Sequence, residues 1–166
     1  MRTFDGYRPG SLAATVALHA AYYAREWRFG LPFEAKVASE LAEFLARMDV
    51  SRDLFLTAWD GDVMLGTVTV DVTGGGEGGA HLRWFIVSDA ARGTGLGGAL
   101  IKRAVAFCDA QQVPRTWLTT FAGLDAAAAL YEKHGFALVS ESDVDQWSGG
   151  VQERLYARPL PVRGGG

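Results

Sequence analysis

The chain has 166 residues, 49% of them hydrophobic, which is enough to bury one sizeable core and leads us to expect a single domain. A formal net charge of −3, with no cluster of lysines and arginines, argues against a nucleic-acid-binding surface. The apolar runs are too short for a membrane span and the first ten residues lack a signal-peptide pattern, so we expect a cytoplasmic protein with no membrane partner.

The first third of the chain predicts one strand and two helices. Residues 2–8 fit a short strand, after which Ser11 is placed to cap a helix. Apolar and aromatic residues recur at helical spacing over residues 12–23, and residues 33–48 resume that spacing. Because Gly30-Leu31-Pro32 separates the two stretches, we expect two consecutive helices.

The middle of the chain predicts three strands. Residues 54–59 and 63–72 flank the tight turn Asp60-Gly61-Asp62, and apolar residues alternate with polar ones in the second stretch. This pattern is typical of an antiparallel hairpin with one buried face. A glycine-rich loop, residues 74–79, leads to residues 80–87, which become apolar on both faces, as in a central strand.

The last third alternates helices and strands: a helix to about residue 112, a strand over 114–121, a helix over 123–134 ended by Gly135, and strands over 136–141 and 151–157. The resulting order β-α-α-β-β-β-α-β-α-β-β predicts an α/β fold of the α+β kind, with a central mixed sheet and helices on both faces. We expect one domain over residues 1–160 and a flexible tail over 161–166.

The most informative stretch follows residues 80–87 and reads Arg92-Gly93-Thr94-Gly95-Leu96-Gly97-Gly98. Backbone N–H groups at such a turn and at the start of a helix lack intrahelical partners, and the helix dipole favours an anion there. Glycine permits the positive φ values that aim several N–H groups at one point, and an arginine adds positive charge. The stretch does not follow a first strand, as a Rossmann fingerprint would, nor does it end in the Gly-Lys-Ser/Thr of a Walker loop. It predicts a pyrophosphate site, and the alternative is a helix N-terminus with incidental glycines.

Three stretches resemble one family of enzymes. The pattern RxxGxG of residues 92–97 resembles the acetyl-CoA pyrophosphate loop of the GNAT superfamily of N-acetyltransferases, and residues 129–136 resemble its closing signature LYxxxGF. The predicted order of elements is also that of the GNAT (acyl-CoA N-acyltransferase) fold. Residues 18–37 and 120–124 resemble more closely the acetyltransferase half of bacterial proteins that fuse a MarR-type winged helix to a GNAT domain.

The resemblance implies an acetyl-CoA-dependent reaction in which an amine attacks the thioester. It implies that residues 92–98 hold the pyrophosphate and that main-chain groups of Phe85, Ile86 and Val87 bind the co-substrate and polarise its carbonyl. The signature tyrosine, here Tyr131, would point its hydroxyl at the CoA sulfur, and a neutral phenol can protonate a departing thiolate. The alternative is that Tyr131 only packs its helix. Leu124 stands where many relatives have an asparagine that contacts CoA.

Two pairs of residues are candidates for the proton acceptor. Glu77 and His81 lie at or before the start of the strand of residues 80–87, where relatives often carry a glutamate. Glu26 and Glu34 lie on the helices that the resemblance places beside the acceptor. We take Glu26 and His81 as candidate catalytic residues, and the alternative for each is an exposed side chain without a catalytic role.

The acceptor is expected among aromatic and charged side chains, which implies a small or flat amine: Tyr23, Glu26, Trp27, Phe29, Arg83, Trp84, Thr119 and Trp147. If Arg83 is buried, it needs an anionic partner. That partner is either an acid group of the acceptor or one of the glutamates at positions 26, 34 and 153, in which case the arginine is structural.

Two functions remain open on the sequence. The first is transfer of the acetyl group of acetyl-CoA to the primary amine of a small molecule. This function needs neither a metal nor nucleic acid, and it is compatible with a homodimer. The second is a non-catalytic acyl-CoA-binding or interaction module. Leu124 and the unassigned proton acceptor favour the second.

Overall fold

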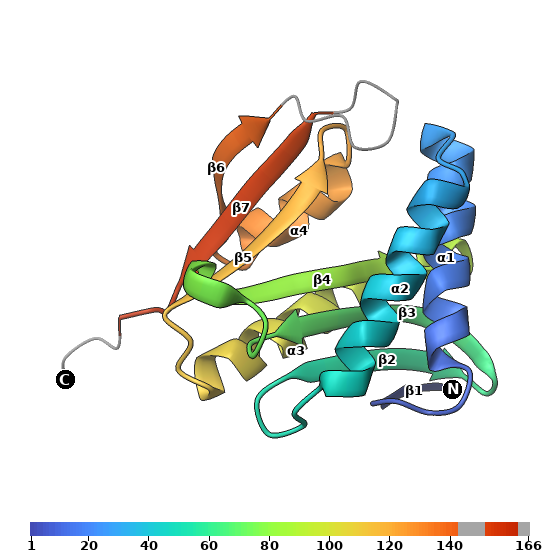
Figure 1. Cartoon of the computed structure of the whole chain (residues 1–166), viewed down its shortest axis with the longest axis horizontal. Helices are drawn as coiled ribbons and strands as arrows, with labels where there is room; N and C mark the ends of the chain where they lie inside the picture. The colour runs from blue at the N-terminus through green and yellow to red at the C-terminus, as the bar shows by residue number, and fades with distance from the viewer. Residues whose placement is uncertain (143–151, 163–166) are drawn as a thin grey trace.

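A computed structural model describes residues 1–142 and 152–162 of the chain (Figure 1). The helices and strands are β1 (Arg2–Asp5), α1 (Ser11–Trp27), α2 (Leu31–Arg47), β2 (Leu54–Asp60), β3 (Val63–Asp71), β4 (Ala80–Val87), α3 (Leu96–Ala110), β5 (Arg115–Phe121), α4 (Asp125–Lys133), β6 (Ala137–Ser142) and β7 (Glu153–Pro159). Their order is the predicted one. Within the described ranges, no helix has the length and apolar character needed to span a bilayer.

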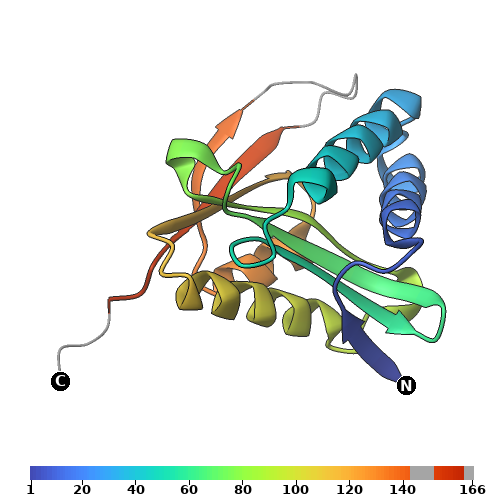
Figure 2. The same ribbon diagram turned by 60° about the horizontal axis from the view of Figure 1, so that its bottom comes forward.

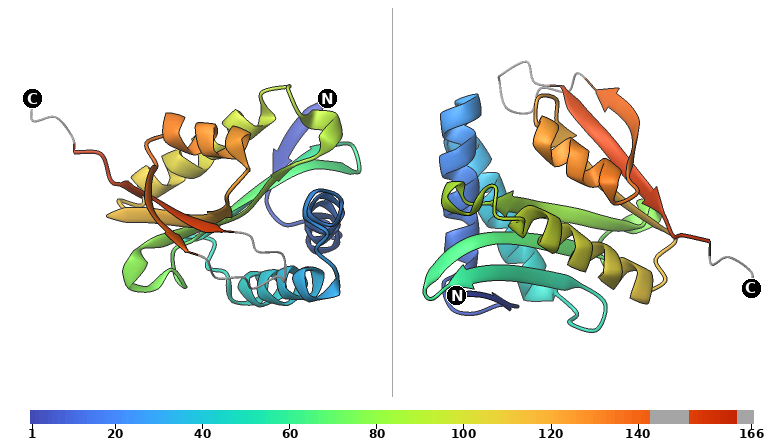
Figure 3. Two further views of the ribbon diagram at one scale, coloured as in Figure 1. Left: turned by 90° about the horizontal axis from the view of Figure 1, so that it is seen from above. Right: turned by 180° about the vertical axis from the view of Figure 1, so that it is seen from behind.

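The strands form one mixed sheet in the order β1-β2-β3-β4-β5-β7-β6. Neighbouring strands are antiparallel except for β4 and β5, which run parallel. Helices α1 and α2 cover one face of the sheet and α3 and α4 the other (Figures 2 and 3). The predicted mixed sheet with helices on both faces is therefore confirmed.

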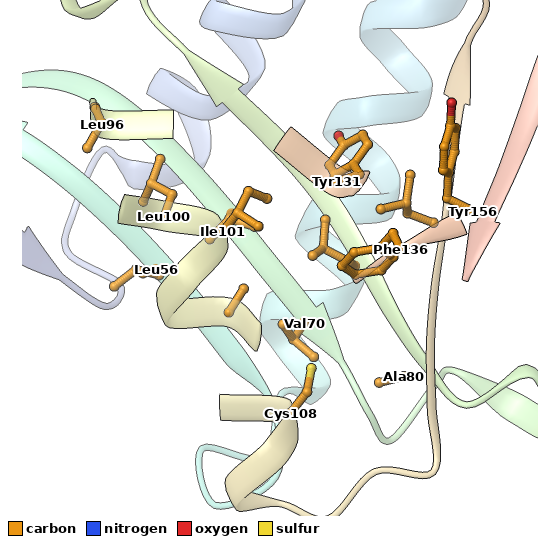
Figure 4. Close-up of a cluster of buried hydrophobic side chains, with 14 of the residues drawn as sticks. Leu56, Val70, Ala80, Leu96, Leu100, Ile101, Cys108, Tyr131, Phe136 and Tyr156 are labelled. Atoms are coloured by element: carbon orange, nitrogen blue, oxygen red, sulfur yellow. The ribbon is translucent and has the colours of Figure 1, made fainter. Parts of the chain in front are cut away.

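Each face of the sheet has its own apolar core. Leu96, Leu100 and Ile101 of α3 are fully buried in one cluster with Val68 and Val70 of β3 (Figure 4). On the opposite face, a second cluster joins α2 to β2 through Leu41, Phe44 and Phe55. Because both faces of the central strands are covered, the end of β4, residues 84–87, is apolar on both sides, as the sequence indicated.

Strands β4 and β5 pair over only a short stretch. The register joins Ala80 to Thr116 and His81 to Trp117, and no later residue of β4 has a partner on β5. In Figure 1 the two strands fan apart beyond this point. The sheet is thus open between β4 and β5, toward the carboxyl end of β4.

Several element boundaries differ from the sequence prediction, and β1 ends at Asp5 rather than at residue 8. Ser11 does not cap α1: Gly10 is the N-cap residue, with φ of 94°, and the Ser11 Oγ accepts a hydrogen bond from the Arg8 N–H at 3.0 Å. Helix α2 begins at Leu31, because proline is well tolerated in the first turn of a helix and Pro32 sits there. Pro159 belongs to β7, opposite Arg115, and most of the expected tail lies outside the described residues.

Candidate active site

The opening between β4 and β5 is a cleft of about 990 Å³. Its walls come from both strands, from the loop after β4, from α4 and from one face each of α1 and α2. A cleft of this size between diverging strands is a common place for a ligand in mixed α/β sheets.

The loop after β4 presents unbonded main-chain donors to this cleft. Gly93 and Gly95 have φ values of 76° and 84°, and a Cβ at either position would meet no atom of the described residues within 4 Å. Among the described residues there is no acceptor for the N–H groups of Gly93, Gly95, Leu96, Gly97 and Gly98. These N–H groups lie at the positive end of the α3 dipole, which is where an anion binds well.

Arg92 stands at the mouth of this loop and lines the cleft. Its guanidinium carbon lies 4.6 Å from the centre of the Tyr22 ring, and its Nη2 lies 3.5 Å from the Asp89 carboxylate. Asp89 accepts two hydrogen bonds from Arg25, of 2.6 and 3.1 Å, which hold the pKa of its carboxyl below the usual value and tie α1 to the loop. Because Asp89 is shared with Arg25, much of the Arg92 charge is left for an incoming anion.

Strand β4 bulges where it borders the cleft. Between Thr67 and Thr69 of β3, the partner on β4 changes from Ile86 to Arg83, so β4 has one residue more than β3 over this interval. Trp84 lies inside the bulge with φ of 48°, a conformation that is strained for a bulky side chain. A strained residue at the edge of a cleft is frequently part of a functional site.

The three residues expected to polarise the thioester follow this bulge. Phe85, Ile86 and Val87 all line the cleft, and all three lie beyond the stretch in which β4 pairs with β5. Main-chain groups on the β5 side of this segment are therefore available to a ligand. All three residues thus lie where β4 and β5 have separated.

Tyr131 of α4 is buried, with 5% of its surface exposed, yet its side chain lines the cleft. Its ring lies 6.0 Å from those of Phe85 and Phe136 and 5.9 Å from that of Tyr156. The hydroxyl points away from Phe136 in Figure 4 and has no hydrogen-bond partner among the described residues. Burial, and then the nearby phenol of Tyr23, raise the pKa of Tyr131 well above its usual value, so the phenol is neutral and able to donate.

The two candidate proton acceptors lie in different places. Glu26 is outside the cleft: half of its side chain is exposed, and it pairs with Arg25 at 3.0 Å near the end of α1. The expectation that it faces the acceptor is thus not met. His81 does line the cleft, stacked on Trp117 with ring centres 3.7 Å apart. Burial, and then the charge of Arg83, lower the pKa of His81 to about 3.

A second imidazole, that of His19 on α1, also lines the cleft. It is 5% exposed, and its Nδ1 lies 2.8 Å from the carbonyl oxygen of Thr15. A carbonyl oxygen can only accept, so Nδ1 carries the proton and Nε2 has a lone pair. Burial lowers the pKa of His19 to about 4. Tyr23, one turn later, also lines the cleft, and burial raises the pKa of its phenol.

Arg83 finds its partner on α2. Its Nη2 donates a hydrogen bond of 2.5 Å to Glu40, a residue that the sequence reasoning did not consider, and not to Glu26, Glu34 or Glu153. Both members of the pair line the cleft. A signal for Glu40 existed in the sequence, because it follows Phe33 and Val37 at helical spacing and so shares their buried face.

The other predicted acceptor residues divide into two groups. Tyr23, Trp84 and Thr119 line the cleft. Trp27 and Phe29 do not, and they pack beside Phe121 instead. Trp147 lies outside the described residues. Sequence reasoning missed Lys36 and Trp117, which also line the cleft.

Residues 13–136 match the acetyltransferase (GNAT) family, and the chain belongs to this family. Members of the family generally use acetyl-CoA, and the fold and the open cleft described above are in keeping with that membership. No curated protein sequence matches the chain. The closer resemblance to MarR-type fusion proteins gains no support from these comparisons and stays a prediction.

Several solved structures share the fold. An acetyltransferase of the GNAT family from Staphylococcus aureus Mu50 is 16% identical, with a TM-score of 0.75, over 97% of this chain and 100% of that one. The ribosomal-protein-S18-alanine N-acetyltransferase of Escherichia coli is 21% identical, with a TM-score of 0.72, over 99% and 97%. Nourseothricin acetyltransferase is 24% identical, with a TM-score of 0.58, over 69% of each chain. The names of the last two proteins give different acceptors, and at such identities the likeness shows the fold alone.

Proposed function

We propose that this protein transfers the acetyl group of acetyl-CoA to the primary amine of a small molecule. The observation that carries the proposal is a set of N–H groups, those of Gly93 and residues 95–98, that have no acceptor among the described residues and lie at the edge of a cleft between β4 and β5. A pyrophosphate on these N–H groups would leave the pantetheine arm to run along β4 toward the bulge. Residues 92–98 are accordingly assigned to the pyrophosphate.

The reaction is a direct attack of the amine nitrogen on the thioester carbonyl. Main-chain groups of Phe85, Ile86 and Val87 are proposed to stabilise the oxyanion, since they follow the bulge and lack partners on β5. When the carbon–sulfur bond breaks, Tyr131 donates its proton to the thiolate sulfur. The nitrogen releases one proton to solvent as the amide forms, and the Tyr131 phenolate takes one up from solvent, so the overall products are the amide and CoA thiol. The raised pKa of Tyr131 keeps this donor protonated before each turnover.

The proposed proton acceptors set a condition on the amine. His81 and His19 line the cleft as neutral rings with pKa values of about 3 and about 4. Such rings accept a hydrogen bond from a neutral amine but bind its proton weakly. We infer that the acceptor reacts in its neutral form, so kcat/KM should rise with pH toward the pKa of the amine. Glu26 has no role in this mechanism.

A small acceptor is supported by aromatic side chains in the walls of the cleft. Trp84, Trp117 and Phe121 line the cleft, and the His81 ring stacks on Trp117. Aromatic walls favour a flat or short amine over an extended peptide. Tyr23, Arg83, Trp84 and Thr119 are proposed to contact it.

Two measurements test this proposal. Acetyl-CoA should raise the melting temperature, because a ligand that binds only the native state stabilises it. Amines of several classes should then release CoA in the presence of acetyl-CoA, followed with a thiol reagent; the single cysteine, Cys108, is buried and contributes little background. Stabilisation by acetyl-CoA without CoA release from any amine would instead support the non-catalytic acyl-CoA-binding module. If acetyl-CoA neither raises the melting temperature nor releases CoA, both functions are contradicted.

A further inference from the structure

We propose that Arg83 binds a carboxylate of the acceptor, so that the amine acetylated by this protein also carries an acid group. The proposal rests on the function proposed above and specifies the substrate class. It starts from a cation in the wall of the cleft: 20% of the Arg83 side chain is exposed, and its guanidinium carbon lies 4.1 Å from the centre of the Trp84 ring.

Arg83 uses little of its hydrogen-bonding capacity. A guanidinium has five N–H groups, and within the described residues only Nη2 of Arg83 has an acceptor, the Oε2 of Glu40. The atoms Nε and Nη1 are not among the polar atoms that are sealed off without a partner. Their N–H groups are therefore accessible to a ligand in the cleft.

Two other arginines of the chain show what a structural role looks like here. Arg47 donates to both carboxylate oxygens of Asp71, at 3.1 and 2.6 Å. Arg158, which is 8% exposed, donates to both oxygens of Asp109, at 2.8 and 3.1 Å. Each therefore forms two hydrogen bonds with one carboxylate. Arg83 forms only one, although burial is the largest influence on the pKa of its guanidinium.

Glu40 only partly neutralises Arg83. Its side chain is 37% exposed, and its Oε1 also lies 3.7 Å from the Lys36 ammonium. Burial lowers the pKa of Arg83 in spite of this carboxylate, which means that a second anion would be favourable beside it. A carboxylate of the acceptor can be this second anion, because its two oxygens can accept from two N–H groups of one guanidinium.

The position of Arg83 fits an acid and an amine within one small molecule. Arg83 directly precedes Trp84 in the bulge, and Phe85 follows Trp84 directly. Arg83 and the proposed oxyanion residues both line the cleft, so one small molecule can contact both. A peptide N-terminus without a nearby acid group would leave these N–H groups unused.

The test compares pairs of acceptors that differ only in the acid group. Glycine, β-alanine and γ-aminobutyrate are each assayed against the matching carboxamide, together with a short peptide that has an amidated C-terminus. For at least one spacing we expect kcat/KM to be about 10- to 100-fold higher for the acid, the range of a charge-assisted hydrogen-bonded contact. Acetylation without preference for any acid, or with preference for the peptide, would overturn the proposal while leaving acetyl transfer intact.

Three variants separate binding from structure. Arg83→Gln should lose the preference for the acid, and Arg83→Lys should keep only part of it, because an ammonium lacks the planar fork. Glu40→Gln is the matched control: it removes the internal partner of Arg83 and should retain the preference. Acetyl-CoA binding, measured by thermal shift, confirms that each variant is folded. A preference that survives in Arg83→Gln, or is lost equally in Glu40→Gln, refutes the assignment.

Discussion

Replacing Tyr131 by phenylalanine removes one oxygen atom from the cleft and leaves the packing of α4 unchanged. The ring contacts with Phe85, Phe136 and Tyr156, at about 6 Å between centres, do not involve the hydroxyl. Because the hydroxyl has no hydrogen-bond partner among the described residues, its loss should change the free energy of unfolding by less than about 0.5 kcal/mol. The variant therefore tests chemistry separately from folding.

The expected effect on catalysis is large by comparison. A positioned general acid contributes about 10²- to 10⁴-fold to a rate, and Tyr131 is the proposed donor to the CoA sulfur. We predict a fall in kcat within this range for Tyr131→Phe, with the KM for acetyl-CoA nearly unchanged. CoA release under saturating acetyl-CoA measures the first quantity, and chemical denaturation measures stability.

A matched control lies in the same apolar cluster. Tyr156 on β7 is a buried phenol whose ring centre is 5.9 Å from that of Tyr131, but it does not line the cleft. Tyr156→Phe should leave kcat within about twofold of the parent. An unchanged kcat in Tyr131→Phe, or equal losses in the two variants, would remove Tyr131 from the mechanism.

Two further predictions concern the loop and the pH dependence of stability. Gly95→Ala and Gly61→Ala each place a Cβ at a positive φ, of 84° and 58°, with no atom of the described residues within 4 Å, so both should destabilise the fold by about 1 kcal/mol. Only Gly95→Ala should raise the KM for acetyl-CoA. Similar KM values in the two variants would argue against the loop as the acetyl-CoA site. Burial lowers the pKa of His19 from 6.5 to about 4, so the unfolded chain takes up its proton first and stability should fall by up to about 3 kcal/mol as the pH drops through this interval. In His19→Gln, denaturation midpoints should depend less on pH between about 4 and 6.5. An unaltered pH dependence would show that His19 does not cause this loss of stability.

The sequence predicted most elements of the fold because their signals are local. The glycine turn at Asp60-Gly61-Asp62 and the apolar run of residues 80–87 give nearly the observed bounds of β2, β3 and β4. The Ser11 cap was wrong because Gly10, at positive φ, takes the N-cap position and leaves the serine inside the first turn. A boundary of this kind depends on backbone conformation that residue type indicates only weakly.

The candidate site was predicted where a contiguous motif defines it. Local sequence patterns indicated the N–H groups of Gly93 and residues 95–98, which have no acceptor among the described residues, and the position of Tyr131 in the cleft. The acceptor side depends on tertiary packing instead. Glu40 and Arg83 meet across 43 positions of the chain, while Glu26, near the end of α1, pairs with its neighbour Arg25. Several glutamates on two helices were equivalent in the sequence, and only the packing of α2 against β4 distinguishes them.

The central claim is that the main-chain N–H groups after β4 bind the diphosphate of acetyl-CoA, and amide NMR shifts test it most directly. On titration with acetyl-CoA, the resonances of Gly93, Gly95, Gly97 and Gly98 should shift strongly, whereas Gly61 in the distant hairpin should not move. S-acetylpantetheine, which lacks the diphosphate, should leave the loop glycines in place. Binding of acetyl-CoA without movement of these four amides, or equal movement with S-acetylpantetheine, would contradict the account.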